Sequence, residues 1–192
     1  YWIVMHEANS NAFRSYQLSS TGISTVAVVS NIGSASAGAT LGGMKISPNG
    51  KKLGFAVSTQ GFEMYDFDAT TGQVSNVLFL GGAPQSGNWS YGCEFSPNSA
   101  IFYGSVFAAS GPVNSNRVYQ WNLCAGSNTA ITASSYTLLG SDLGSRLGMQ
   151  LALDGKIYVT RSNNVLSVIS SPNSVGLGCG FIDQAYNTAP KT

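Results

Sequence analysis

The segment "GGMKISPNGKKLGFAVSTQGFEMYDFDATTGQVSNVLFL", Gly42 to Leu80, reads as four short strands separated by turn residues. Apolar stretches alternate with clusters of Gly, Pro, Asn and Asp, which is the pattern of a meander of antiparallel strands. The Asn-Gly pair after the first strand favours a tight hairpin, because both residues tolerate positive φ. The segment therefore predicts strands at about 43–47, 52–57, 62–67 and 74–80.

Parts of this segment return further along the chain. The turn "ISPNGKK" at 46–52 is matched by "FSPNSAI" at 95–101 and by "LALDGKI" at 151–157. Strands built around a tyrosine recur as well, at Tyr16, Tyr65, Tyr119 and, with serine in its place, Ser167. The period is about 50 residues, in the range of propeller blades. The sequence thus predicts an all-β chain folded as a β-propeller, with about four blades of four antiparallel strands.

The expected blades form a single propeller region over the whole chain, with approximate bounds 1–38, 39–84, 85–143 and 144–192. The first blade starts at what should be a second strand, "WIVMHE", and the last has a fourth strand only suggested by "GLGCGFID". Both outer blades are therefore expected to be incomplete. Either the two ends complete one another in a small ring, or the chain belongs to a larger propeller, which we favour. Open edges would then pair with additional propeller sequence or other subunits.

Helical periodicity is missing throughout the sequence. The stretch "ITASSYTLLGSDLGSRLG", 131–148, could hold a helical turn, but its Ser and Gly content favours a strand followed by a loop. No charged segment followed by an apolar one opens the chain, and Tyr1 begins directly in strand-like sequence, as in a mature or excised chain.

The composition excludes some classes of partner. Charged residues make up 9% of the chain, against roughly 25% in an ordinary domain. The net charge is +1 and no run of Lys or Arg occurs, so a nucleic-acid partner is not expected. No apolar run approaches the roughly 18 residues that span a bilayer, so membrane insertion is not expected either. Many small polar side chains suit neutral partners such as glycans or other proteins.

Seven motifs follow one another in a fixed order: "HEANSNAFRSYQLSSTGI", "GGMKISPNGKKLGFA", "MYDFDATTGQVSNVLFL", "YGCEFSPN", "RVYQWNL", "MQLALDGKIYV" and "LSVISSPNSVGLGCGF". As a set, they resemble the propeller region of large secreted surface proteins of Bacteroidota. Those proteins often carry a gliding-motility-associated sorting domain and leave the cell by the type IX secretion system. The resemblance covers nearly the whole chain. It implies an extracellular or outer-cell-surface location and a part in adhesion, gliding-related surface structure or assembly, with no catalytic residues.

Three cysteines, Cys93, Cys124 and Cys179, cannot all pair within the chain. Their spacing contains no CxxC, so a zinc site is not expected. Cys93 lies in an apolar strand, and we expect it to be free and buried. A disulfide between Cys124 and Cys179 is a less favoured alternative to free thiols.

"YDFDATTG" places Asp66, Asp68 and Thr70 at alternate positions, like the start of a calcium-binding loop. An EF-hand loop also needs Gly at its sixth position and Glu at its twelfth, where this chain has Thr71 and Val77. We therefore favour an Asx-type turn, in which Asp68 accepts hydrogen bonds from backbone N–H groups. Calcium remains the less favoured interpretation, and no other cofactor is expected.

Signals for catalysis are weak. His6 is the only histidine, and its neighbour Glu7 points to the opposite face of the strand, so we expect a packed or hydrogen-bonded His6. The chain has no GxSxG motif, and its glycine-rich stretches lack the strand-to-helix context of a phosphate loop. Acidic residues fall at turns and strand ends, although two of them facing each other across blades would suit glycoside chemistry.

Aromatic residues give the best binding candidates. Trp121 takes the strand position of Phe67 and should lie in the core between blades. Trp89, with Asn88 and Tyr91, lies in the Gly/Ser-rich "PQSGNWSYG", where it either contacts a glycan or protein or folds over the propeller edge. Loops around 33–39, 82–91 and 108–116 would carry specificity. We expect a non-catalytic binding or scaffold module; the alternative is a carbohydrate-active propeller enzyme with paired carboxylates near the central channel.

Overall fold

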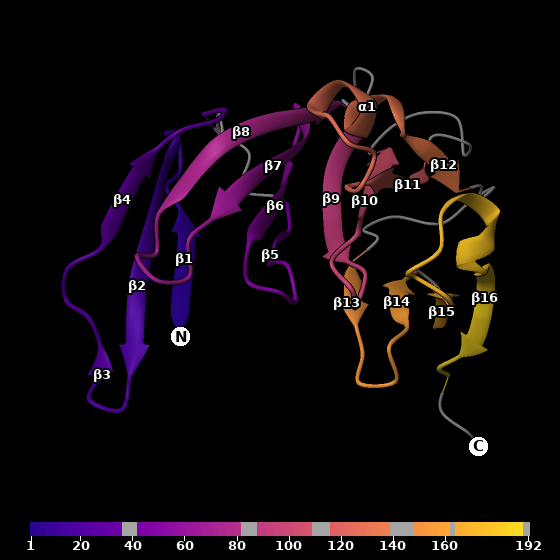
Figure 1. Ribbon diagram of the computed structural model, residues 1–192. Helices are drawn as coiled ribbons and strands as arrows, with labels where there is room; N and C mark the ends of the chain where they lie inside the picture. The colour runs from indigo at the N-terminus through magenta and orange to yellow at the C-terminus, as the bar shows by residue number, and fades with distance from the viewer. Residues whose placement is uncertain (36–41, 82–87, 109–115, 139–147, 162–163, 190–192) are drawn as a thin grey trace.

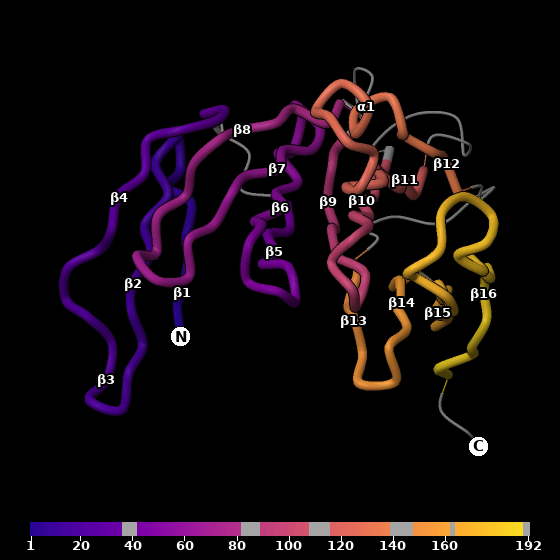
Figure 2. Tube along the Cα trace, in the orientation of Figure 1, coloured from indigo at the N-terminus to yellow at the C-terminus, as the bar shows by residue number. Residues whose placement is uncertain are grey.

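The computed structural model describes residues 1–35, 42–81, 88–108, 116–138, 148–161 and 164–189. These residues form four antiparallel sheets. Figure 1 shows the sheets following one another in chain order along an arc, from the N-terminal sheet in indigo to the C-terminal sheet in yellow. The Cα trace in Figure 2 places the two chain ends at opposite ends of this arc.

Three sheets have four strands in sequence order. The second sheet contains β5 (Met44–Ile46), β6 (Lys52–Val57), β7 (Gly61–Phe67) and β8 (Val74–Gly81). The third contains β9 (Asn88–Phe95), β10 (Ile101–Ala108), β11 (Arg117–Asn122) and β12 (Tyr136–Leu138). The fourth contains β13 (Met149–Leu151), β14 (Ile157–Thr160), β15 (Val165–Ile169) and β16 (Phe181–Asn187). The four strands predicted between Gly42 and Leu80 are confirmed to within one residue at each end.

The first sheet is built differently. It contains β1 (Trp2–His6), β2 (Ala12–Ser19), β3 (Gly22–Ile23) and β4 (Val28–Asn31), and both β3 and β4 pair with β2. Ile3 on β1 pairs with Tyr16, as Leu53 on the second strand of the next sheet pairs with Tyr65. β1 is therefore a second strand, and the described residues contain no inner strand for this sheet. The fourth sheet has all four strands, because β16 forms the fourth strand. The prediction that the last blade is incomplete was therefore wrong.

The innermost strands of the other three sheets lie side by side. β9 contacts both β5 and β13. Met44, Cys93 and Met149 lie on these three strands, each the first strand of its sheet. Successive four-stranded sheets with neighbouring inner strands are the blades of a β-propeller, so the predicted fold is confirmed.

The core consists of three clusters, one between each pair of neighbouring sheets. Fully buried members include Phe13, Leu53 and Tyr65 in the first cluster, Phe62, Phe95 and Trp121 in the second, and Tyr103, Ile157 and Ile169 in the third. Trp121 is fully buried, and its indole Nε1 donates to the Leu80 carbonyl of the preceding sheet at 3.2 Å. The expectation that Trp121 lies between blades is confirmed.

The Ser-Pro-Asn turns close the first hairpin of the second and third sheets in the same way. Ser47 Oγ accepts from the Lys52 N–H at 2.9 Å and donates to Asn49 Oδ1 at 2.8 Å. In the third sheet, Ser96 and Asn98 repeat the side-chain bond at 2.8 Å. The repeated motif therefore encodes a repeated hydrogen-bonded turn.

Each of these turns also bonds to the next sheet. The Asn49 N–H donates to Ser99 Oγ at 3.1 Å, and the Asn98 N–H donates to Asn173 Oδ1 at 3.1 Å. One turn residue thus forms hydrogen bonds both within its own hairpin and to the neighbouring sheet.

The stretch from 131 departs from the prediction of a strand and a loop. A short helix, α1 (Asn128–Ala133), precedes β12, and the Oγ of its N-cap Ser127 accepts from the Ala130 N–H at 3.1 Å. Ile131 packs against the core between the second and third sheets, which stabilises a helix too short to form alone. The strand part of the prediction is confirmed by β12, and residues 139–147 lie outside the described residues.

Candidate functional site

The inner strands of the second, third and fourth sheets border a pocket of about 280 Å³. Its lining includes Gly43 and Lys45 from the second sheet, Tyr91 and Cys93 from β9, and Met149 from β13. The starts of β5 and β13 and the middle of β9 therefore meet at this point, which we call the axial mouth. Much of the three loops expected to carry specificity (36–39, 82–87 and 109–115) lies outside the described residues.

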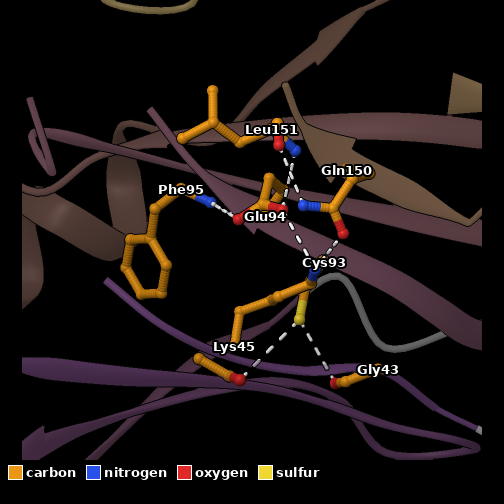
Figure 3. Close-up of polar contacts among 8 residues, drawn as sticks. Gly43, Lys45, Cys93, Glu94, Phe95, Gln150 and Leu151 are labelled. Carbon is orange, nitrogen blue, oxygen red and sulfur yellow. Dashed lines mark hydrogen bonds and ion pairs between the residues drawn. The ribbon is translucent and has the colours of Figure 1, made fainter. Parts of the chain in front are cut away.

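A buried carboxylate joins the three inner strands next to the axial mouth (Figure 3). Glu94 Oε2 on β9 lies 3.2 Å from Lys45 Nζ on β5 and accepts from the Leu151 N–H on β13 at 2.9 Å. Its Oε1 accepts from the Phe95 N–H at 2.9 Å, and Lys45 Nζ also donates to Gln150 Oε1 at 2.8 Å. Charge-assisted bonds to both neighbouring sheets offset the cost of burying this charge.

The sequence contains a signal for this cluster. Lys45, Glu94 and Gln150 are the central residues of "MKI", "CEF" and "MQL", the three inner strands as the repeat aligns them. The same position in three successive repeats therefore holds a cation, an anion and an amide, in a chain that has few charged residues. Residues at one repeat position on adjacent inner strands lie close together, so their complementary chemistry predicts contact.

The thiol next to Glu94 serves a structural role. Cys93 Sγ lies 3.2 Å from the Gly43 carbonyl oxygen and 3.7 Å from that of Gly54, both in the second sheet. Burial raises the pKa of the Cys93 thiol to about 12, so the thiol stays protonated at neutral pH and is a poor nucleophile. The prediction of a free, buried Cys93 is confirmed.

Trp89 does not lie in a loop, so that prediction was wrong. Asn88 begins β9, and Trp89 pairs with Phe107 of β10, just past a register shift between Gly104 and Val106. The rings of Trp89 and Tyr91 are half-buried and meet the Phe107 ring edge-on, with centroids 5.3 and 5.5 Å away. The strand ladder extends further toward the Gly/Ser-rich segment than its composition suggested, and it fixes both aromatic side chains on a rigid element.

Asp66 and Asp68, the carboxylates of the candidate calcium site, bind different partners within the chain. Asp68 accepts from the Thr70 N–H at 2.8 Å and from Thr71 Oγ1 at 2.9 Å, which confirms the Asx-type turn. Asp66, on β7, instead pairs with Lys52 Nζ at 2.5 Å. Within the residues that the structure describes, no group of three or more His, Cys, Asp or Glu side chains is placed to hold a metal ion.

The alternative of a disulfide between Cys124 and Cys179 is not borne out, because both are free thiols. Cys124 is exposed just after β11. Cys179 is buried in the short 3₁₀ helix η2 (Gly176–Cys179), where it packs in the core between the third and fourth sheets.

His6 is packed between aromatic rings, as expected. Its ring centroid lies 4.7 Å from that of Phe13 and 4.8 Å from that of Phe55. Burial lowers the pKa of His6, and the negative charge of Glu63 opposes this shift. A neutral imidazole at the interface of the first and second sheets therefore has a packing role.

The two buried carboxylates of the described chain lie in different interfaces. Glu63 accepts from the Tyr65 hydroxyl and from the Ser34 N–H, close to the first sheet. Glu94 is bound to Lys45 in the second sheet and to the main chain of the fourth. The structure therefore does not bring these two acids together in the manner that a glycosidase requires.

Comparison with known proteins points to the fold. No family model matches the sequence, and no curated protein matches it. A Bacteroides uniformis crystal structure, named as a proposed 6-phosphogluconolactonase, superposes with a TM-score of 0.62 and 15% identity, over 96% of this chain and 50% of that one. A Lactobacillus plantarum protein gives a TM-score of 0.57 and 14% identity, over 87% and 47%. The RRP9 WD40 repeats give a TM-score of 0.53 and 13% identity, over 90% and 45%.

This chain spans about half the length of each of these structures. At such low identity the likeness concerns the fold, and the fold is a β-propeller. Among the described residues, no helix has the length and apolar character needed to cross a membrane.

Proposed function

We propose that this chain is a non-catalytic binding or scaffold module that makes protein or glycan contacts at the axial mouth. The observation that carries the proposal is the placement of Tyr91, half-buried on β9, in the lining of a pocket of about 280 Å³, with the half-buried Trp89 two residues earlier on the same strand. Aromatic rings held on a strand offer a large apolar surface with little loss of conformational entropy on binding.

The polar groups around the axial mouth support binding over chemistry. Glu94 is already paired with Lys45 and with backbone N–H groups, and the Cys93 thiol is protonated at neutral pH. These groups stabilise the contacts between the sheets. The aromatic side chains of Trp89 and Tyr91 are then the residues that contact a partner.

We also propose that the chain belongs to a secreted Bacteroidota surface protein, exported by the type IX system and acting in adhesion, gliding-related surface structure or assembly. The ordered set of repeat motifs supports this location. An antibody against the chain should label intact cells of the source bacterium as strongly as lysed cells. Labelling only after lysis would contradict the proposed location.

We further propose that additional propeller sequence or another subunit covers the first sheet. Ile3 and Met5 are 39% and 55% exposed, whereas Leu53 and Phe55, which occupy the same register in the second sheet, are 0% and 9% exposed. The first sheet covers Leu53 and Phe55. An equivalent sheet on the other side of the first sheet would cover Ile3 and Met5. Burying the exposed part of these two side chains stabilises by about 1 kcal/mol each, roughly half the figure for a fully exposed side chain.

Binding at the axial mouth can be tested by titrating the full chain with a panel of neutral oligosaccharides and extracellular proteins. Trp89→Ala and Tyr91→Ala should weaken any binding at least tenfold, whereas Tyr136→Ala, which removes an exposed tyrosine of β12, should have no effect. Hydrolysis of a glycoside or a sugar lactone by the purified chain would overturn the non-catalytic proposal.

The cover on the first sheet can be tested by thiol labelling of Met5→Cys in a Cys124→Ser background. In a longer polypeptide carrying further repeats, position 5 should react at least tenfold more slowly than in the 192-residue chain. Leu153→Cys, at a fully exposed turn, should react equally in both. Equal reactivity at position 5 would contradict covering by propeller sequence, and protection that rises with protein concentration would favour a subunit.

A further inference from the structure

The inner edge of the first sheet carries main-chain groups that β1 does not use in pairing with β2. Within the described residues, no strand pairs with the other side of β1. The Tyr1 carbonyl accepts from the Leu18 N–H at 2.8 Å, and the Glu7 N–H donates to the Ala12 carbonyl at 2.9 Å. Because bonded residues alternate along an antiparallel pair, the odd-numbered residues from Tyr1 to Glu7 are the ones bonded to β2.

The even-numbered residues of β1 direct their main-chain groups to the open edge. The N–H and C=O groups of Trp2, Val4 and His6 therefore form a row that is ready to pair with another strand. The side chains of these three residues pack toward the second sheet, where the His6 ring meets that of Phe55. This packing holds the edge in a fixed position.

The other three sheets show what occupies the corresponding edge. In each of them an inner strand pairs with the second strand. The N–H of the residue that follows the inner strand donates to a carbonyl at the start of the second strand, at 2.9 Å in all three sheets. These donor and acceptor pairs are Ser47 with Lys52, Ser96 with Ile101 and Ala152 with Lys156.

The alternation along β1 matches that along its counterpart β6. Pairing with the repeat tyrosine aligns the even-numbered residues of β1 with Lys52, Gly54 and Ala56. These residues of β6 bond to the inner strand: the Lys52 carbonyl accepts from the Ser47 N–H, and the Ala56 N–H donates to the Gly43 carbonyl, both at 2.9 Å. The open edge of β1 thus presents the same main-chain groups that bind β5 in the second sheet.

The C-terminal end of the chain does not reach this edge. Figure 2 places the two chain ends at opposite ends of the arc, and β16 belongs to the fourth sheet. The propellers with which this chain superposes are about twice as long, since it spans 50% and 47% of two of them. Both observations favour a strand from a further repeat.

The inner strands of the chain share a pattern of an apolar, a polar and an apolar residue. They read Met-Lys-Ile at 44–46, Cys-Glu-Phe at 93–95 and Met-Gln-Leu at 149–151. In each strand the two apolar side chains pack in the cluster that faces the preceding sheet. A strand of this kind on β1 would place its apolar side chains next to the exposed Ile3 and Met5.

We propose that the open edge of β1 binds an antiparallel inner strand from a further propeller repeat of the same polypeptide. The main chain of this strand bonds to Trp2, Val4 and His6. Its two apolar side chains extend the surface of Ile3 and Met5, and the polar residue between them faces the second sheet. The inference rests on the proposed further propeller sequence, and it names the segment which that sequence contributes and the edge which that segment occupies.

The probe is the full chain extended before Tyr1 by "GMKISPNG", the sequence of residues 43–50, which contains β5 and its turn. Hydrogen exchange at the Val4 and His6 amides should be roughly tenfold slower in the extended chain than in the 192-residue chain. Ile3 and Met5 should exchange slowly in both chains, because their N–H groups already bond to β2. Their protection shows that the first sheet is intact.

Two control extensions test whether strand pairing causes the protection. An extension of the same length built from Gly and Ser should leave exchange at Val4 and His6 as it is in the 192-residue chain. The lysine of the added segment corresponds to Lys45, which pairs with Gly54 in the second sheet. Proline in place of that lysine removes an N–H that faces β1, and most of the protection should be lost.

Three results would overturn the proposal. The first is equal exchange at Val4 and His6 in the strand-forming and the Gly/Ser extensions. The second is full protection in the proline variant. The third is protection of the unextended chain that rises with protein concentration, which would assign the edge to a second copy of this chain.

This test is independent of the tests of the proposed function. Trp89→Ala should leave the protection of Val4 and His6 unchanged, so failure at the axial mouth can be told apart from failure at this edge. Thiol labelling of Met5→Cys reports on the face of the first sheet, whereas amide exchange reports on its edge. A further repeat that covers the face without pairing with β1 would therefore be recognised.

Discussion

The side-chain ammonium of Lys45 lies 3.2 Å from Oε2 of Glu94, and the two residues occupy the same position in successive repeats. Gln150, at that position in the next repeat, accepts from the same ammonium at 2.8 Å. One repeat position thus supplies three complementary side chains, and together they fix three neighbouring sheets.

Replacing Lys45 by Met should destabilise the chain, because Glu94 would remain buried without its cation. We expect a loss of about 2 kcal/mol in the free energy of unfolding, less than the roughly 3–5 kcal/mol for a fully buried pair, since Lys45 is partly exposed. Urea denaturation measures the change. Lys156→Met should leave stability unchanged, and an equal loss in both variants would show that the Glu94 pair has no special role.

Only one of the three thiols should react with a thiol reagent in the native chain. Cys124 is exposed, whereas Cys93 and Cys179 are buried and their pKa values are raised by burial. Reagent counts at pH 8 should therefore give one thiol in buffer and three in denaturant. Cys124→Ser should abolish the native reaction, and a native count of zero with a disulfide in the mass spectrum would contradict the free thiols.

Stability should fall as the solution becomes mildly acidic. Burial places the pKa of His6 in the folded chain below its unfolded value near 6.5. Between these two pKa values, the unfolded chain binds a proton at His6 and the folded chain does not. The contribution of His6 to the free energy of unfolding is therefore fully present above the unfolded pKa and is lost as the pH falls through the folded pKa. His6→Phe should flatten the dependence at pH values below about 6.5. The same slope in both chains would exclude His6 as its source.

Gly54 should not tolerate a methyl group. A Cβ at this position would lie 2.2 Å from the Phe102 ring of the next sheet. Gly54→Ala should therefore cost about 1–3 kcal/mol through overpacking. Gly178 offers ordinary contact distances, with Ser174 Cβ at 3.5 Å, so Gly178→Ala should be close to neutral. Thermal unfolding of both variants measures the difference. A loss of stability in Gly54→Ala alone would show that close packing requires glycine at position 54, whereas equal losses would point to the backbone conformation.

Much of the fold could be predicted because each sheet is specified locally. The Asn49-Gly50 turn and the alternation around it placed β5 and β6, and the repeat then placed Cys93 and Met149 on equivalent strands. Trp121 could be assigned to the core because it follows the repeat tyrosine in the same phase as Phe67. These features depend on residues close in sequence or on the period itself.

The candidate sites were harder to predict because they depend on contacts between sheets. Glu94 meets Lys45 across about one repeat length, and neither side chain alone signals the pair. α1 has few residues, and packing of Ile131 against another sheet sustains it. The small neighbours of Trp89 predict a loop, whereas pairing with Phe107 extends the strand to include it.

The hydrogen bond from the Asn49 N–H to Ser99, and its counterpart from Asn98 to Asn173, make the repeats interdependent. A cut between two repeats removes an acceptor from the retained turn, so an excised repeat lacks a contact that it makes within the array. Duplications that lengthen such an array keep these bonds between turns and neighbouring sheets when they insert whole periods in phase.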